Sequence, residues 1–229
     1  MKSTLNPSPA GTRRLARVAL RATTIIALLW ATAPSAQVYR PERARRSIST
    51  EYHQLVIQKN SQIDLLAVQG QPLIDNAFPS VIFEDGKQEA LDIDFRNTSR
   101  YSVNSPIGKG NGFHYASAEC EWRIATYPAD SFLTFDLTFI NNSKKPVIVA
   151  GLVPLGTGKD QKGGVYLGNT NDTLMLRPPT LDDPFARIER ELQASPGHLA
   201  AWSPSSGRTF VAGFLTHRGS LGAITLNQK

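Results

Sequence analysis

The sequence predicts an all-β protein, a large antiparallel β-sandwich with one short helix. Apolar and polar residues alternate in many short segments, which is typical of strands with one buried and one exposed face. Clusters of Gly, Pro, Asn, Asp and Ser separate these segments at short intervals, as expected of turns. Strands do not alternate with long helical segments, so the sequence does not encode a parallel α/β sheet.

The most regular alternation lies between residues 112 and 155. The segments 118–124 and 133–139 alternate strictly, and the segment 146–155 is nearly all apolar. Residues 127–130 and 141–145 separate the three segments and are predicted to be turns. Three successive antiparallel strands with a shared apolar face can form the centre of a sheet. The apolar set of the first two segments is Ala118, Cys120, Trp122, Ile124, Leu133, Phe135, Leu137 and Phe139.

The remaining elements are shorter. Residues 97–112 are polar and rich in glycine, and the sequence predicts a loop there that leaves the sheet. The one predicted helix covers residues 183–192, because Asp183 can cap it, and Phe185, Ile188 and Leu192 recur at spacings of three and four. Further strands are predicted within residues 47–59, 65–68, 79–83, 91–95, 173–176, 198–202, 209–216 and 221–226.

Residues 1–36 are predicted to be an export signal, removed by cleavage between Ala33 and Ala36. Basic residues without any acidic residue precede the apolar segment 22–33, and small residues follow it. The apolar segment is shorter than the roughly 20 residues of a membrane-spanning helix. We therefore expect an exported protein, periplasmic or extracellular; an uncleaved amphipathic anchor and a misassigned start codon are the alternatives.

Charge and cysteine content exclude two classes of protein. The net charge is +5 for residues 1–36 and +3 for the basic junction 37–46, so the total of +6 leaves the predicted domain 47–229 at −2. A nucleic-acid partner needs a basic domain surface and is not predicted. The single cysteine, Cys120, excludes an internal disulfide, and its phase with Trp122 predicts a buried apolar side chain.

No constellation of catalytic or metal-binding residues is visible. The four histidines lack metal-ligand spacing, so neither a metal nor a cofactor is predicted. The glycine-rich segment 156–164 lacks the order of residues of a phosphate-binding loop. Glu119 and Glu121 would lie about 7 Å apart on one strand face, which favours a solvated surface over a glycosidase pair that faces across a cleft.

Three residues are candidates for contact with carbohydrate: Trp202, Trp122 and His114. An aromatic ring can stack on the apolar face of a pyranose. Trp122 is in phase with Cys120, which favours the core, whereas Trp202 lies at a strand end beside a turn and favours the surface. His114 is a candidate because it could work with Glu119 in an epimerase.

Two segments resemble parts of the amino-terminal β-domain of bacterial α-galactosidases of glycoside hydrolase family 36. The first is ECEWRIATYPADSFLTFDLTFINNSKKPVIVAGLVPL, and the second contains GRTFVAGFLT at residues 207–216. The resemblance covers about a third of the chain after residue 36. It implies a galactose-mutarotase-like super-sandwich that precedes a catalytic (β/α)8 barrel. The catalytic aspartates of that family belong to the barrel, so no catalytic residue is carried over to this chain.

The resemblance therefore implies a non-catalytic domain of an α-galactosidase-like enzyme. Its implied partner is a carbohydrate or a catalytic (β/α)8 barrel. A domain that lacks its barrel would expose the surface that the barrel normally covers. We therefore predict an exposed apolar patch larger than about 600 Å². The alternatives are a free-standing exported carbohydrate-binding or scaffold protein and a mutarotase-like epimerase. A homo-oligomer is compatible with each of these hypotheses.

Overall fold

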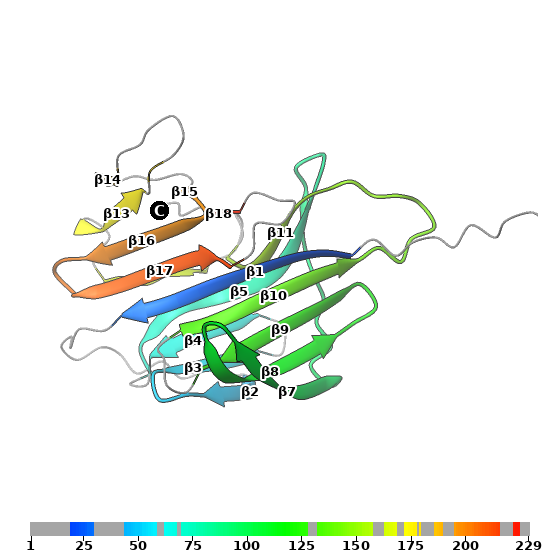
Figure 1. Ribbon diagram of the computed structural model, residues 1–229, viewed down its shortest axis with the longest axis horizontal. Coiled ribbons are helices and arrows are strands. Elements are labelled where there is room, and N and C mark those ends of the chain that lie inside the picture. Colours follow the sequence, from blue (N-terminus) through cyan, green and yellow to red (C-terminus); the bar gives the residue numbers. More distant parts are fainter. Residues whose placement is uncertain are drawn as a thin grey trace, which may run out of the picture.

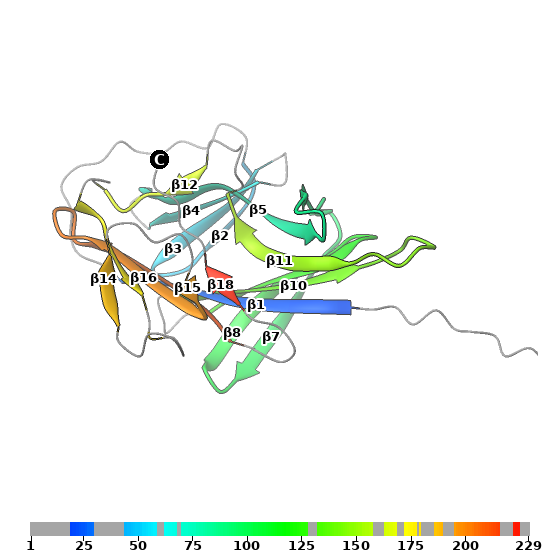
Figure 2. The same cartoon turned by 90° about the horizontal axis from the view of Figure 1, so that it is seen from above.

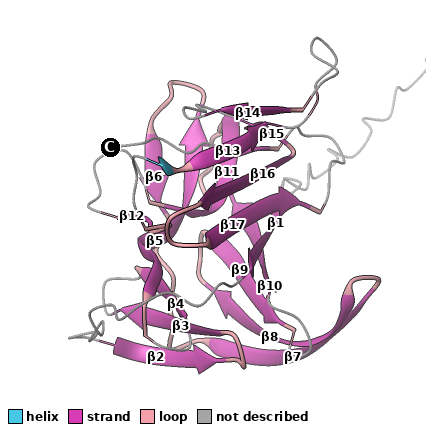
Figure 3. Ribbon diagram, turned by 90° about the vertical axis from the view of Figure 1, so that its left-hand side faces the viewer, coloured by secondary structure: helices cyan, strands magenta, loops and turns pink. Residues whose placement is uncertain are grey.

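The computed structural model describes residues 19–29, 44–58, 62–67, 70–127, 132–157, 163–168, 172–177, 179, 186–189, 195–215 and 222–224. These residues form antiparallel strands in two large sheets that lie as separate layers (Figure 2). The predicted all-β sandwich is thereby confirmed. The one helical turn in the described part of the chain lies at Asp172 (Figure 3).

The larger sheet has nine strands, and neighbours in the following order pair with each other (Figure 1). The order is β14 (Arg187–Glu189), β13 (Leu174–Arg177), β16 (His198–Ser203), β17 (Arg208–Phe214), β1 (Ala19–Leu29), β10 (Phe132–Ile140), β9 (Cys120–Thr126), β8 (Gly108–Ala116) and β7 (Thr98–Ser105). Every pairing in this sheet is antiparallel, so turns and hairpins connect many of its neighbours.

The second sheet has seven strands. Its main order is β11 (Val149–Gly156), β5 (Pro72–Phe83), β4 (Ile63–Ala67), β3 (His53–Gln58) and β2 (Ala44–Ser49). The short strands β12 (Gly164–Val165) and β6 (Gln88–Ala90) also pair with β5. A separate two-stranded sheet consists of β15 (Ser195–Pro196) and β18 (Ala223–Ile224).

One hydrophobic core lies between the two large sheets. Trp122 lies at the centre of this core and is 0 % exposed. Its ring packs against those of Tyr115 and Phe135 at centroid distances of 6.0 and 5.9 Å. The Trp122 indole donates a hydrogen bond of 3.0 Å to the carbonyl of Pro154 on β11. This buried bond connects the two sheets directly. The second sheet contributes Leu55, Ile57, Ile63, Leu65 and Val81 to the same core.

Two predictions of local structure are wrong. Residues 97–112, predicted to be a loop, form most of the hairpin β7–β8. Its polar residues hide the strand period, because both faces of this hairpin are largely exposed or half-buried. The predicted helix is contradicted at its centre, because Ile188 lies in strand β14 and is 64 % exposed, so it does not mark a buried helical face. The other residues that predicted this helix, Asp183, Phe185 and Leu192, lie outside the described residues.

Residues 91–95 show the predicted alternation without entering a ladder of strands. Leu91, Ile93 and Phe95 are buried, whereas Asp92 is exposed. The amide of Leu91 donates a hydrogen bond of 2.9 Å to the carbonyl of Pro79. The alternation therefore reports burial of one side of an extended segment, which need not be a strand.

Strand β1 comes from the predicted export signal and lies inside the nine-stranded sheet. It pairs with β10 over nine residues, from Ala19 opposite Ile140 to Ala27 opposite Phe132. It also pairs with β17 over six residues. The expected cleavage site between Ala33 and Ala36 lies outside the described residues, in the segment 30–43 that connects β1 to β2. Removal of residues 1–36 stays a prediction. Among the described residues, no helix has the length and apolar character to cross a membrane.

Candidate functional site

A group of charged side chains lies on the outer face of the nine-stranded sheet, away from the core. His114 on β8 is the cross-strand partner of Arg123 on β9, and Arg123 is in turn the partner of Asp136 on β10. Glu121 lies two residues before Arg123 and so shares its face. We call these four residues the polar strip. Their neighbours in sequence, such as Tyr115 and Trp122, point into the core.

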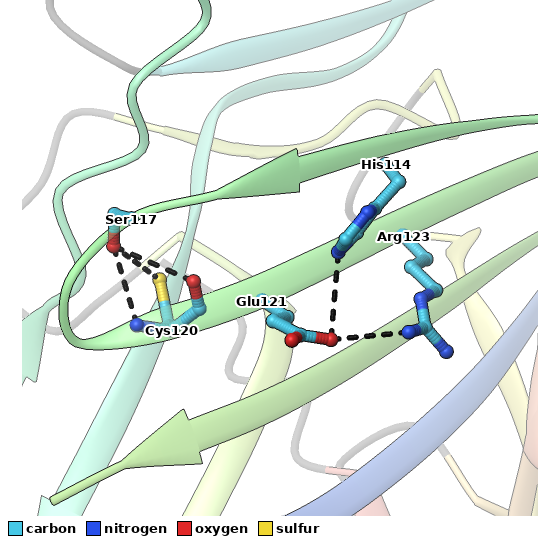
Figure 4. Close-up of polar contacts among 5 residues, drawn as sticks. All are labelled: His114, Ser117, Cys120, Glu121 and Arg123. Carbon is cyan, nitrogen blue, oxygen red and sulfur yellow. Dashed lines mark hydrogen bonds and ion pairs between the residues drawn. The ribbon is translucent and has the colours of Figure 1, made fainter. Parts of the chain in front are cut away.

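One carboxylate oxygen links three members of the polar strip (Figure 4). The Glu121 Oε2 lies 3.0 Å from an Arg123 guanidinium nitrogen and 3.4 Å from the His114 Nε2. The three side chains are 24 to 37 % exposed. The His114 Nε2 is buried and makes no aligned hydrogen bond within the described residues. The strip thus offers a fixed carboxylate, a guanidinium and an imidazole to a polar ligand.

An aromatic ring lies beside the polar strip. Tyr101 on β7 is the cross-strand partner of Gly112 on β8. A Cβ atom at Gly112 would overlap the Tyr101 ring, so the ring covers this glycine. Gly112 is two residues before His114, which places the covered position on the same face. Tyr101 therefore adds an aromatic platform to the hydrogen-bonding groups, a combination suited to carbohydrate.

Sequence reasoning found only part of this site. It named His114, but it missed Tyr101 because residues 97–112 were predicted to be a loop. The polar strip itself follows from the alternation, since Glu121 and Arg123 occupy the polar phase of a strongly alternating segment. What the alternation cannot give is the register, which decides that His114 lies opposite Arg123.

Trp122 is not a surface contact. Its side chain is 0 % exposed, and its only polar atom is bonded to Pro154 inside the core. The structure thus contradicts its candidacy for contact with carbohydrate and confirms the alternative of core packing. The same alternation that marks a strand marks its buried face, and Trp122 belongs to that face together with Cys120 and Ile124.

Trp202 lies on the outer face of the nine-stranded sheet, far from the polar strip. It is half-buried on β16, where its cross-strand partners are Leu174 and Thr209. Five strand spacings separate β16 from β8, which at about 4.8 Å each is about 24 Å. Trp202 and His114 therefore cannot contact the same monosaccharide, and the structure does not bring the three candidates together.

The carboxylate pair considered above is not formed. Glu119 lies in the turn between β8 and β9 and is exposed, whereas Glu121 lies on β9 and binds Arg123. His114 contacts Glu121 and not Glu119. The pair of His114 with Glu119 that was considered for an epimerase is therefore wrong. Asp136 lies opposite Arg123 and therefore shares a face of the sheet with Glu121. A glycosidase needs its two carboxylates on opposite sides of the scissile bond.

Cys120 is a buried structural residue. Its side chain is 0 % exposed, and its Sγ lies 3.3 Å from the Ser117 hydroxyl (Figure 4). Burial raises the pKa of the Cys120 thiol, while the hydrogen bond from Ser117 acts in the opposite direction. The prediction of a buried cysteine is confirmed; because a protonated thiol is a poor nucleophile, we expect the side chain to be unreactive in the folded protein.

A second polar cluster joins the two sheets near the β16–β17 turn. Arg208 donates hydrogen bonds to the side chain of Gln71 and, at 3.4 Å, to the carbonyl of Tyr166. The Tyr166 hydroxyl donates a bond of 2.9 Å to Asp75. Partial burial, followed by this hydrogen bond, raises the pKa of Tyr166 to about 12. Arg208, which lies in the second resembling segment, thus links the β16–β17 hairpin to the other sheet.

The described residues contain no group of three or more His, Cys, Asp and Glu side chains that could hold a metal ion. The polar strip has one imidazole with two carboxylates on a flat face, and Arg123 already neutralises Glu121.

Comparison with known proteins found no matching family model, no matching curated protein and no matching solved structure.

Proposed function

We propose that this chain is a non-catalytic β-sandwich domain of an exported α-galactosidase-like glycoside hydrolase, and that it contacts carbohydrate through the polar strip and Tyr101. The observation that carries the proposal is the composition of that face, which presents an aromatic ring, a carboxylate and a guanidinium on neighbouring strands. Glu121 and Asp136 lie on the same face of the sheet, unlike the facing carboxylates of a glycosidase.

The positions of the two resembling segments support the link to this class of enzyme. The first segment covers β9, β10 and most of β11, and the second forms β17. Both contribute to the core and to the contacts between the sheets, through Trp122 in the first and Arg208 in the second. The resemblance is thus spread over residues that would specify this sandwich.

The far end of the same outer face supports a partner domain. Ile188 pairs with Leu176, and Ala200 joins Leu176 to Val211 in the same row. This row is apolar throughout, and Ile188 is 64 % exposed. An apolar end of a sheet face is the kind of surface that a catalytic barrel would cover. The expected patch larger than about 600 Å² stays a prediction.

The test is a calorimetric titration of the full chain and of two variants with α-galactosides. Arg123→Gln removes a charged donor, and Tyr101→Ala removes the aromatic platform. Each should weaken binding by about tenfold or more, because a lost charge-assisted bond or stacked ring is worth about 1.4 kcal/mol or more. Arg96→Gln, which removes an exposed arginine paired with Asp94, is the matched control.

Three results would contradict the proposal. Hydrolysis of an α-galactoside by the purified chain would show a catalytic domain. Interconversion of galactose anomers above the buffer rate, followed by polarimetry, would favour the epimerase. Equal binding by Arg123→Gln and the unmodified chain, with equal urea midpoints, would remove the polar strip from the site.

The free-standing carbohydrate-binding protein is the second candidate, and Trp202 separates it from the first. Trp202 is half-buried on the outer face, about 24 Å from His114 across the sheet. If Trp202 is the sugar platform, Trp202→Ala abolishes glycan binding while Tyr101→Ala leaves it unchanged. Our proposal expects the opposite pattern.

A further inference from the structure

Strand β1 lies between two strands of the nine-stranded sheet that do not pair with each other. We call the rest of the chain, from β2 onward, the body. Figure 1 shows it between β17 and β10, which both pair with it and not with each other. We call this position the β10–β17 slot, bounded by Phe132–Ile140 on one side and Arg208–Phe214 on the other. Both of its pairings are antiparallel. The slot therefore accepts one extended segment in one direction.

The two edges of the slot need an occupant. An unpaired strand edge presents a row of free amides and carbonyls, and buried groups of this kind cost free energy unless they are bonded. The core residues that border the slot are Leu133, Phe135 and Leu137 on β10, with Phe210 and Ala212 on β17. An empty slot would expose this part of the core to water.

The present occupant belongs to the predicted export signal. Its residues 23–26 are Thr, Thr, Ile and Ile, which are β-branched and favour a strand. Its connection to β2 runs through residues 30–43, which contain the expected cleavage site between Ala33 and Ala36. Cleavage there would separate β1 from the rest of the chain.

The slot cannot close easily when β1 leaves. Direct pairing of β10 with β17 would need these strands to approach from about 9.6 Å to about 4.8 Å. Contacts to the second sheet hold both sides: Trp122, on the neighbour of β10, is bonded to Pro154, and Arg208 on β17 is bonded to Gln71. Closure would therefore require one side of the slot to move relative to the second sheet, against these bonds.

We propose that the β10–β17 slot is a strand-acceptor site, filled after export by an extended segment of a partner polypeptide that replaces Ala19–Leu29. This inference rests on the predicted removal of the export signal and goes beyond the proposed function, which does not say how a partner is held. The segment recognised is uncharged at its centre and β-branched, with residues suited to pair with Leu133, Phe135 and Leu137. Its backbone supplies the binding energy and its alternate side chains the specificity, as in other strand additions.

The experiment uses the full chain with a specific protease site inserted in residues 30–43. The folded protein is cut, and an excess of a synthetic peptide with the sequence of residues 19–29 is added, carrying a fluorophore on an added carboxyl-terminal lysine. The control peptide has Ile26→Pro, because Ile26 pairs with both Leu133 and Ala212 and proline removes its amide. Gel filtration then measures the fluorescence bound to the body.

We expect one labelled peptide to replace the cut fragment on each body, with at least tenfold less capture of the proline peptide. If the cut body aggregates, rescue by the first peptide and not by the second supports the proposal equally. Four outcomes overturn it: a fragment that stays and never exchanges, a fragment that leaves while the body captures no peptide, equal capture of both peptides, and aggregation that neither prevents. None of these readouts involves glycan, so failure here and failure of the proposed function are separate results.

Discussion

His53 should make the stability of this protein depend on pH. Its side chain is 2 % exposed on β3, and its buried Nε2 has no hydrogen-bond partner among the described residues. Burial lowers the pKa of His53 from 6.5 to about 4. As pH falls below 6.5 the unfolded chain takes up a proton that the folded chain does not, so the free energy of unfolding decreases. These two pKa values give a loss of about 2 kcal/mol between pH 7.5 and pH 5.

Urea unfolding followed by tryptophan fluorescence measures this loss at each pH. His53→Gln removes the titrating group, so its free energy of unfolding should fall by about 2 kcal/mol less over the same range. Carboxylates also titrate there, but they are the same in both proteins and cancel in the comparison. His198→Gln, which removes an exposed imidazole, is the control and should behave like the unmodified chain. An equal loss of stability in His53→Gln and the unmodified chain would refute the reasoning.

Three further predictions follow from buried and bridging groups. Trp122→Phe leaves the Pro154 carbonyl without its donor and creates a cavity, so urea unfolding should show a loss of about 2 to 4 kcal/mol. Cys120 should not react with a thiol reagent at pH 8 in the folded protein but should react fully in denaturant, because burial raises its pKa; rapid reaction of the folded protein would contradict this. Arg208→Lys should cost about 1 kcal/mol in the same unfolding assay, because an ammonium cannot keep the forked bonding that includes Gln71, and unchanged stability would argue against that bridge.

The sequence was sufficient where one face of a strand is apolar and the other polar. Trp122, Phe135 and Leu137 were predicted to share a buried face, and all three are fully buried. The period of two is strong in these strands because the core lies on one side only. The fold class and the buried cysteine follow from the same pattern.

Prediction failed where burial does not follow that period. The hairpin β7–β8 carries Ser, Thr, Asn and Gly, and its strands are held by backbone pairing and by the Tyr101 ring over Gly112. Ile188 suggested a helix because three-residue spacings also arise by chance in a short exposed edge strand. The polar strip was found only in part, because cross-strand register brings His114 to Arg123 and no local pattern encodes register.

The place of β1 also sets the order in which the sheet can form. Thr24 of β1 pairs with Phe214, which lies 190 positions later in the chain. The other neighbour of β1 is β10, which ends at Ile140. The nine-stranded sheet therefore cannot close during synthesis until residues 208–214 have left the ribosome, and such distant pairings fold slowly. If residues 1–36 act as the predicted export signal, the export machinery that holds them also withholds the central strand of this sheet. The nine-stranded sheet would then stay open until the signal is released.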